Sequence, residues 1–309
     1  MIIVSASDHN FLPGLMVLLY SAWMNNRHAH FHVIDTGLGT DGTQKLTAFC
    51  ARHGIACRTL RIDLERLARL PDAGRLSAST YARLFIPELL PEHDRAIYID
   101  ADAMVLADLE PLWDFDLGDD LLAGVVDGGM EPDFLDRIGI ARGHYINAGV
   151  LRMNLDRWRT ERIGARCVEQ LMRHPELDLA DQTAINIVAK GRIRTLDETY
   201  NVFASARLPR GDGGPRILHF AGPDKPWQRQ GVPMAGLFEA YGRASGAVFP
   251  VPRRAWSPTA IRKTTLGLLA LRPKYWRLLL VQAERRAFVR RHVRGLSTRT
   301  APAGRSGAA

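Results

Sequence analysis

Two aspartates separated by one residue follow an apolar stretch in the first half of the chain. The segment Ala96–Val105 reads AIYIDADAMV, with Asp100 and Asp102 after three bulky apolar residues. Such residues are typical of a buried strand in a parallel sheet, and open α/β sheets bind ligands at the carboxyl ends of their strands. Alternate residues of a strand face the same side, so both carboxylates could bind one divalent cation. Two carboxylates leave coordination positions of the cation free for phosphate oxygens. The alternative is an Asp-rich turn without a metal.

A second group of polar residues follows another short apolar segment. Arg216–Trp227 reads RILHFAGPDKPW and contains His219, Gly222 and Lys225. A neutral imidazole complements two carboxylates around an ion such as Mn²⁺. Gly222 allows the backbone to approach a phosphate, and Lys225 supplies a positive charge for it. A core histidine and a solvated loop lysine are the simpler alternatives, but the two segments together predict a metal and phosphate site.

These segments and several others resemble glycosyltransferase family 8, as known from bacterial lipopolysaccharide galactosyl- and glucosyltransferases. The resemblance extends from the first residues to about Trp227, and the segments come in the order of the family. The similar segments are SASDHN (Ser5–Asn10), STYARL (Ser79–Leu84), YIDADAMV (Tyr98–Val105), HYINAGVLRMN (His144–Asn154), LADQTAIN (Leu179–Asn186), Tyr200-Asn201 and HFAGPDKPW (His219–Trp227).

The resemblance implies an α/β fold of the nucleotide-sugar-binding (GT-A-like) type, with a mixed, mostly parallel sheet flanked by helices. It also implies a retaining enzyme that moves galactose or glucose from a UDP-sugar to a saccharide acceptor, with Mn²⁺ or Mg²⁺ as the metal. The product would be lipopolysaccharide or another cell-surface glycan. The stretch between the Asp-Gln pair and His219 is short for the family, and this stretch usually helps to form the acceptor side.

The resemblance also assigns roles to individual residues. The expected metal ligands are Asp100, Asp102 and His219. The residues expected to bind the donor are Asp8 and Asn10 at the uridine, Gly222 and Lys225 at the diphosphate, and Arg83, Asp127, Asn147 and Ala148 near the sugar. The residues expected to act in catalysis are Gln182, Asp181 and Lys225. Because an amide is a poor nucleophile, a front-face reaction and a covalent double displacement are both compatible with Gln182 beneath the anomeric carbon.

Each of these residues also has a simpler explanation. A strand-end turn or a helix cap would explain Asp8 and Asn10, and Asp181 resembles an N-cap residue. Surface ion pairs would explain Arg83 and Asp127, and turn hydrogen bonds would explain the asparagine at position 147.

Two other classes of function, a phosphatase and a non-catalytic binding module, share some of these sequence features. An Asp-x-Asp motif after a strand also resembles the nucleophile motif of haloacid-dehalogenase-like phosphatases, but neither Gly118-Asp119 nor Gly211-Asp212 is followed four residues later by the aspartate of that family. A non-catalytic module that binds sugar nucleotides is the second alternative. The presence of all metal and phosphate residues disfavours it.

The elements that must position these residues alternate along the chain. Predicted strands are 2–6, 32–36, 57–62, 96–99, 121–127, 147–153 and 216–220, and predicted helices are 12–26, 41–52, 79–88, 160–173 and 182–189. Asp41 and Asp181 are the expected N-caps. Glycine-rich dinucleotide fingerprints do not follow the first strand, which argues against a dehydrogenase. An odd number of cysteines, three, and no recognisable secretory signal predict a cytoplasmic protein.

Charge divides the chain into two predicted parts, a catalytic domain of residues 1–250 and a basic tail of residues 251–309. The tail holds fourteen Lys or Arg and one acid, Glu284, giving +13. Because the whole chain carries +8, the catalytic domain carries −5. The basic residues of the tail alternate with apolar ones. These apolar residues are Trp256, Leu266, Leu268, Leu269, Leu271, Tyr275, Trp276, Leu278, Leu279, Leu280 and Phe288.

This mixture of basic and aromatic residues favours attachment to an anionic membrane surface over binding to nucleic acid. A basic tail without a partner is the simpler alternative. The apolar runs are interrupted by charges and are too short to cross a bilayer. We therefore expect a peripheral protein on the inner face of the plasma membrane, where its acceptor would be carried on a lipid.

Overall fold

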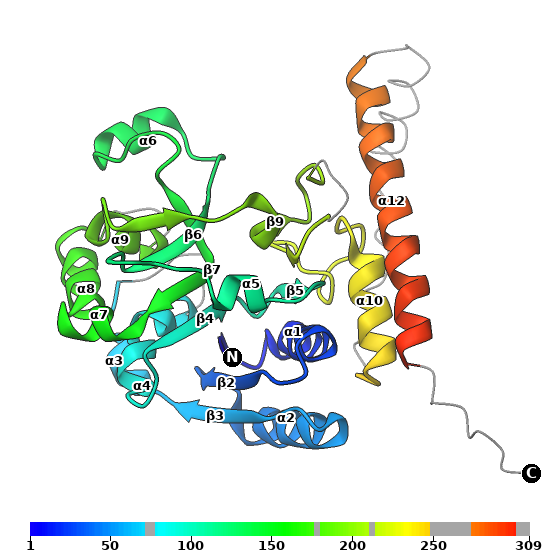
Figure 1. Cartoon of the computed structure of the whole chain (residues 1–309), viewed down its shortest axis with the longest axis horizontal. Helices are drawn as coiled ribbons and strands as arrows, with labels where there is room; N and C mark the ends of the chain where they lie inside the picture. Colours follow the sequence, from blue (N-terminus) through cyan, green and yellow to red (C-terminus); the bar gives the residue numbers. More distant parts are fainter. Residues whose placement is uncertain (72–77, 176–179, 210–213, 248–272, 301–309) are drawn as a thin grey trace, which may run out of the picture.

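A seven-stranded sheet forms the centre of the computed structural model, in the order β3-β2-β1-β4-β7-β6-β8 (Figure 1). The structure describes residues 1–71, 78–175, 180–209, 214–247 and 273–300. The strands are β1 (Ile2–Ser7), β2 (His30–Asp35), β3 (Cys57–Arg61), β4 (Arg95–Ile99), β6 (Leu122–Val126), β7 (Ile146–Asn154) and β8 (Ile193–Thr195). Only β7 runs against its neighbours, β4 and β6, while the other pairs are parallel. This sheet confirms the expected mixed, mostly parallel α/β fold.

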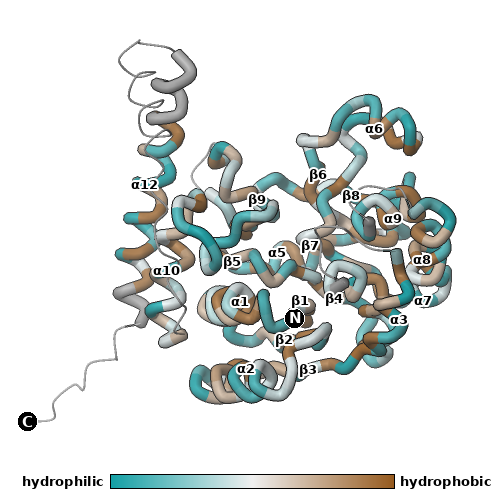
Figure 2. The backbone as a smooth tube through the Cα atoms, turned by 180° about the vertical axis from the view of Figure 1, so that it is seen from behind, coloured by the Kyte–Doolittle hydropathy of each residue, from teal (hydrophilic) through white to brown (hydrophobic). Residues whose placement is uncertain are grey.

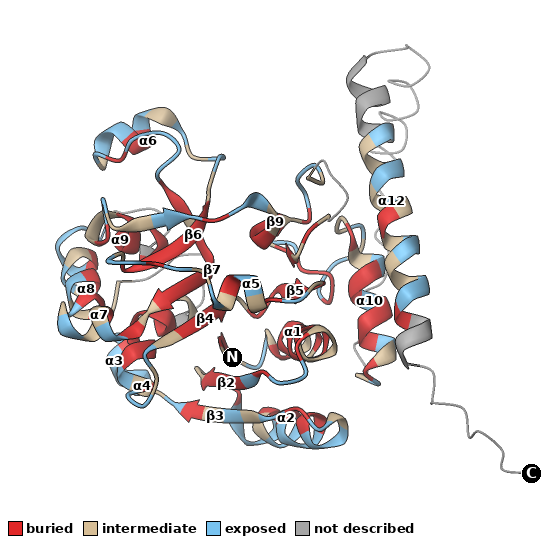
Figure 3. Cartoon of the chain, in the orientation of Figure 1, coloured by how far each residue is buried: buried red, intermediate tan, exposed pale blue. Residues whose placement is uncertain are grey.

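Alternating apolar side chains let the sheet bury both faces (Figure 3). In β4, Ile97 and Ile99 join one hydrophobic cluster, and Ala96 and Tyr98 join the other. The helices of the first cluster are α1 (Leu12–Asn25), α2 (Gly39–His53), α5 (Glu110–Trp113), α10 (Ala235–Ala244) and α12 (Pro273–Thr300). The second cluster includes α3 (Leu64–Ala68), the 3₁₀ helix η1 (Ala78–Phe85), α4 (Ile86–Leu89), α7 (Leu155–Thr160), α8 (Ile163–Arg173) and α9 (Ala180–Val188). A small third cluster includes α6 (Pro132–Arg137).

A separate three-stranded sheet brings the two halves of the chain together. It contains β5 (Ala103–Val105), β10 (Ile217–His219) and β9 (Val202–Phe203), which follows the 3₁₀ helix η2 (Glu198–Asn201). β5 and β10 are antiparallel, and His219 pairs with Ala103. This register places the histidine opposite the residue that follows the second aspartate of the Asp-x-Asp motif.

Several predicted helices differ from the observed ones. Residues 79–88 form η1 and then the short α4 rather than one α-helix. The predicted helix over 160–173 is interrupted at Arg162, which has a left-handed φ of 53°. Asp41 lies in the first turn of α2, whose N-cap is Leu38, so its prediction as a cap is wrong.

Helix α12 packs against α10 at one side of the molecule (Figure 1). Figure 2 shows polar and apolar residues alternating along it. Phe288, 3% exposed, and Leu296 belong to the same hydrophobic cluster as the sheet. The prediction of Phe288 as a membrane-facing residue is therefore wrong, because its ring is buried against the protein itself.

Of the expected tail, the structure describes residues 273–300, and side chains only for 280–296. Leu280 is 62% exposed. The remaining apolar residues named for the tail, from Trp256 to Leu279, lie outside the residues whose side chains the structure describes. The predicted domain boundary at residue 250 also lies outside the described residues. Within the described chain, no helix is long and apolar enough to cross a membrane.

Substitution of Phe288 by alanine is expected to loosen α12 without unfolding the sheet. Loss of a buried aromatic ring costs about 3 kcal/mol, which corresponds to roughly a hundredfold faster hydrogen exchange in a locally opening helix. Hydrogen exchange followed by mass spectrometry would measure this rate for α12. Leu280→Ala on the same helix is the control, because its exposed side chain loses little. Unchanged exchange in Phe288→Ala would contradict the packing described here.

Candidate functional site

Polar side chains gather at the carboxyl edge of the parallel strands. Asp8 follows β1 and Asp100 follows β4, and these two strands are parallel neighbours. Asp127 follows β6. Because β7 runs in the opposite direction, Asn147 near its start reaches the same edge. The topology therefore brings together residues that are widely separated in sequence.

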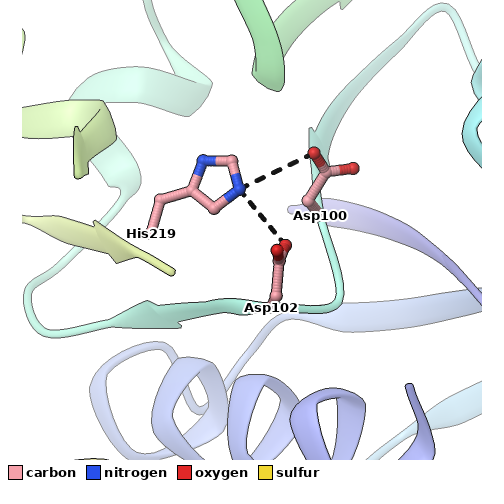
Figure 4. Close-up of side chains that lie close together, drawn as sticks. All are labelled: Asp100, Asp102 and His219. Carbon is pink, nitrogen blue, oxygen red and sulfur yellow. Dashed lines mark ion pairs between the residues drawn. The ribbon is translucent and has the colours of Figure 1, made fainter. Parts of the chain in front are cut away.

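Asp100, Asp102 and His219 form a cluster in which one potential ligand atom of each lies within 4.8 Å of the others (Figure 4). His219 Nε2 lies 3.2 Å from Asp102 Oδ1 and 3.8 Å from Asp100 Oδ2. The aspartates occupy the turn between β4 and β5, where Ala103 N–H donates to the Asp100 carbonyl at 3.0 Å. They converge through this turn, so the prediction that strand alternation aligns them is wrong. The grouping itself agrees with the expected ligand set.

Asp102 is the more buried of the two aspartates in the cluster, at 7% exposure. Lys225 Nζ donates to its Oδ2 and also to the carbonyl oxygen of Phe220, at 2.9 Å for the latter. Burial opposes the charged carboxylate, but His219 and Lys225 more than offset this and hold the pKa of Asp102 well below its usual range. The carboxylate is therefore ionised, as a metal ligand must be.

Arg83 fixes Asp100 from the side of η1. Its guanidinium, 5% exposed, lies 2.9 Å from Asp100 Oδ1, which also accepts from the Tyr98 hydroxyl at 2.7 Å. The same guanidinium donates to the Ala148 carbonyl. Burial opposes its charge, but Asp100 and Asp181 more than offset this and raise the pKa of Arg83. Arg83 is thus buried in an ion-pair network, so the surface ion pair considered above does not describe it.

Asp181 completes this network from the first turn of α9. Its Oδ2 lies 2.8 Å from Arg83 Nε, and its Oδ1 accepts from the Thr80 hydroxyl at 2.6 Å. Burial raises the pKa of Asp181, with Arg83 and Thr80 acting against the shift. α9 begins at Ala180, so Asp181 lies inside the helix and its prediction as an N-cap is wrong.

Gln182, Asn147 and Asp127 form an amide–carboxylate group on the other side of the cluster. Gln182 Oε1 accepts from Asn147 Nδ2 at 2.9 Å and from Ala148 N–H at 3.1 Å. Its Nε2 donates to Asp127 Oδ2 at 3.2 Å. The structure therefore brings together four of the residues that the sequence assigned to donor binding or catalysis, although the ligands they would contact remain a prediction.

Gly149, to which the sequence assigned no role, separates the metal cluster from this amide group. Its N–H donates to Asn147 Oδ1 at 2.9 Å, and its carbonyl accepts from Asp100 N–H at 2.8 Å. A Cβ atom here would collide with His219 Cε1 and would lie 2.9 Å from Asp100 Oδ2. The family-like Asn-Ala-Gly-Val segment includes this glycine, but only the three-dimensional contacts show why the residue after Ala148 is glycine.

The residues predicted at the uridine and diphosphate lie at the ends of β1 and β10. Asp8 Oδ1 accepts from the N–H groups of Asn10 and Phe11, at 2.9 and 3.1 Å. Asp8 therefore forms the strand-end turn that was considered as the alternative to uridine binding. Asn10 does not cap α1, whose N-cap is Phe11, and its carbonyl accepts from Trp227 Nε1 at 3.0 Å. Gly222 has a left-handed φ of 99°, which favours glycine.

The donor set of this site fits a divalent cation. Carboxylates and an imidazole suit Mn²⁺ and similar ions. Among the residues named here, the carboxylates Asp100, Asp102 and Asp181 face two permanent cations, Arg83 and Lys225. These three carboxylates outnumber the two cations, which favours an added cation at the cluster.

Comparisons with known proteins agree with this geometry. The sequence model described as glycosyl transferase family 8 matches residues 2–231. General stress protein A of Bacillus subtilis is 28% identical over 247 residues, which cover 73% of this chain and 86% of that protein. The lipopolysaccharide 1,3-galactosyltransferase of Salmonella typhimurium is also 28% identical, over 73% of this chain and 72% of that protein.

A solved structure shares the fold over most of the chain. The galactosyltransferase LgtC, in complex with donor and acceptor sugar analogs, has a TM-score of 0.71 and 29% sequence identity. The likeness covers 82% of this chain and 98% of LgtC.

Substitution of Asp102 by asparagine is expected to destabilise the metal-free protein in a pH-dependent way. It leaves Lys225 buried without its carboxylate, at a cost of about 3 kcal/mol at neutral pH. Because the folded-state pKa of Asp102 is depressed, its contribution is complete above the ordinary aspartate pKa of about 4 and is lost as the pH falls through the folded value. The difference between the two proteins should therefore shrink in acid.

Urea unfolding with chelator present, from neutral pH down to about pH 2, would measure this difference. Asp133→Asn at the exposed start of α6 is the control and should follow the wild type. An Asp102→Asn protein as stable as the wild type at neutral pH would contradict the proposed balance of charges.

Proposed function

Because the chain belongs to glycosyl transferase family 8, we propose that this glycosyltransferase moves galactose or glucose from a UDP-sugar to a saccharide with retention of configuration. The observation that supports this most is the cluster of Asp100, Asp102 and His219 beside the amide group around Gln182. One half of the site suits a metal and a diphosphate, and the other suits sugar hydroxyls. The product is a lipopolysaccharide or another cell-surface glycan.

The nucleotide half of the site uses charge. Asp100, Asp102 and His219 would hold Mn²⁺, with Mg²⁺ as the alternative, and the bound ion would supply positive charge for a diphosphate. Lys225 lies beside Asp102 and would supply positive charge for the diphosphate, and Gly222 would let the backbone approach it. Asp8 and Asn10 hold the uridine. The positive groups stabilise the negative charge that develops on UDP as the glycosidic bond breaks.

The sugar half of the site uses hydrogen bonds. Asp127, Asn147, the Ala148 backbone and Arg83 orient the sugar hydroxyls, and Gln182 lies beneath the anomeric carbon. Asp181 contributes through Arg83, since its two oxygens already contact Arg83 and Thr80.

The state of the Gln182 amide favours one of the two mechanisms. Two N–H donors occupy its Oε1, which leaves little electron density for attack on a carbon. We therefore favour a front-face reaction, in which the leaving phosphate accepts the proton of the acceptor hydroxyl.

The exposed arginines of α12 support the membrane part of the proposal. Arg286, Arg290 and Arg294 recur along α12 and are exposed, while Phe288 faces the protein. We propose that this helix binds the anionic inner face of the plasma membrane from the cytoplasm and brings the site to a lipid-linked saccharide. Nucleic acid is not the expected partner.

Hydrolysis of the donor in the absence of acceptor tests the catalytic proposal. We expect slow Mn²⁺-dependent release of UDP from UDP-galactose or UDP-glucose. Asp100→Asn should lower this rate at least about a hundredfold at saturating Mn²⁺, because a metal ligand is lost. Asp116→Asn, at an exposed turn, is the control. Full activity of Asp100→Asn would refute the metal assignment, and turnover of a phosphate monoester alone would support the phosphatase alternative.

Sedimentation with phosphatidylglycerol vesicles tests the membrane proposal. Replacing Arg286, Arg290 and Arg294 together by glutamine should weaken binding, since each basic residue near an anionic surface contributes about 1 kcal/mol. The attraction should also decrease with salt. Replacing Arg137, Arg142 and Arg173, which are exposed on and near α6 and α8, removes the same charge elsewhere and should have no effect. Equal binding by both triple variants would refute the assignment to α12.

A further inference from the structure

Asn201 is buried between the metal cluster and the amide group, and the function proposed above gives it no role. It ends η2 and is 5% exposed. Its Nδ2 lies 2.7 Å from Asn147 Oδ1, and its Oδ1 lies 2.9 Å from His219 Nδ1. Asp197 accepts from Thr199 N–H at 3.0 Å and thereby fixes the turn that presents Asn201. The asparagine therefore connects the two halves of the site directly.

Backbone N–H groups determine the direction of the hydrogen bonds in this connection. Ala148 N–H points at one side-chain atom of Gln182, and Gly149 N–H points at one side-chain atom of Asn147. A backbone N–H can only donate, so both of these side-chain atoms must be oxygens. The other end of the Gln182 amide then donates to Asp127, and a carboxylate can only accept. The amide orientations thus follow from chemistry as well as from the coordinates.

The amide orientations determine which ring nitrogen of His219 carries the hydrogen. Since the Asn147 oxygen accepts, Asn201 must present its NH₂ to it and its own oxygen to His219. Nδ1 of His219 must then carry the hydrogen, and in the neutral imidazole Nε2 keeps a lone pair. This is the nitrogen that faces Asp100 and Asp102.

We infer that Asn201 is a positioning residue that holds His219 in the Nδ1–H tautomer and directs its Nε2 lone pair into the metal cluster. The inference rests on the proposed function for the identity of the cation, while the tautomer is a property of the protein alone. Hydrogen bonds to the second nitrogen of a metal-binding histidine commonly change metal affinity ten- to a hundredfold. In the sequence, Asn201 is part of the family-like Tyr-Asn pair, which predicts no role for it.

A nearby asparagine provides a matched control for general effects of burial. Asn186 on α9 is 1% exposed and, like Asn201, makes hydrogen bonds at both ends of its amide. It accepts from Ile146 N–H at 2.8 Å and donates to the Ile146 and Gln182 carbonyls at 2.9 and 2.8 Å. None of these bonds contacts His219, so Asn186→Leu removes comparable buried bonds without releasing the imidazole.

The test compares Asn201→Leu, Asn201→Asp and Asn186→Leu in the full chain. The His219 tautomer is read from ¹⁵N shifts of labelled histidine at alkaline pH, with the signal identified by its loss in His219→Gln. Mn²⁺ affinity without donor is read by electron paramagnetic resonance. We expect Asn201→Leu to lose the pure Nδ1–H tautomer and to bind Mn²⁺ ten- to a hundredfold more weakly. Asn201→Asp should retain the Nδ1–H tautomer, because its carboxylate also accepts from Nδ1, although it loses the hydrogen bond to Asn147. Asn186→Leu should resemble the wild type in both properties.

Two results would overturn the inference. One is a wild-type tautomer in Asn201→Leu, and the other is an equal loss of Mn²⁺ affinity in Asn201→Leu and Asn186→Leu. If Asn201→Leu does not fold, a wild-type protein with the hydrogen on Nε2 would overturn it as well. Failure of the wild type to bind Mn²⁺ would refute the proposed metal, and the tautomer comparison would still decide the role of Asn201.

Discussion

The burial of Arg83 is the interaction on which the rest of the site depends. A single guanidinium contacts Asp100 from the metal cluster, Asp181 from α9 and the Ala148 carbonyl from β7. A buried carboxylate is costly unless it is paired, so Asp181, 2% exposed, depends on this cation for its position. The arginine comes from η1, so this short 3₁₀ segment connects three parts of the fold.

One peptide segment of β7 serves both halves of the site. Asn147, Ala148 and Gly149 contribute hydrogen bonds to the amide group and, through the Gly149 carbonyl, to the backbone of Asp100. A small rotation of this segment would therefore move Asp100 and the amide group around Gln182 together. The pairing of β7 with β6 shifts register beside this segment, so its bonds to Gln182, Arg83 and the Asp100 N–H hold it in place.

The sequence predicted the parts of the molecule that depend on local patterns. Apolar strands with polar residues at their ends revealed the sheet and the grouping of Asp100, Asp102 and His219. It did not predict the pairing of Arg83 with Asp181, since their partners are distant in sequence and their residue types equally fit a surface. The role of Gly149 depends on a close approach between strands, and the contacts of Asn201 depend on three segments at once. Burial of Phe288 was missed because the irregular spacing of arginines hides the apolar side of α12.

The position of α12 has a consequence for how the protein is made. The cluster that contains Ile3 of the first strand also contains Phe288 and Leu296. Synthesis proceeds from the N-terminus, so the sheet emerges from the ribosome while the surface that α12 covers is still bare. The nascent chain must keep this apolar surface from other molecules until its final helix arrives. A chaperone that binds exposed apolar surface would act in this interval, before α12 covers α10 and the cluster beside it.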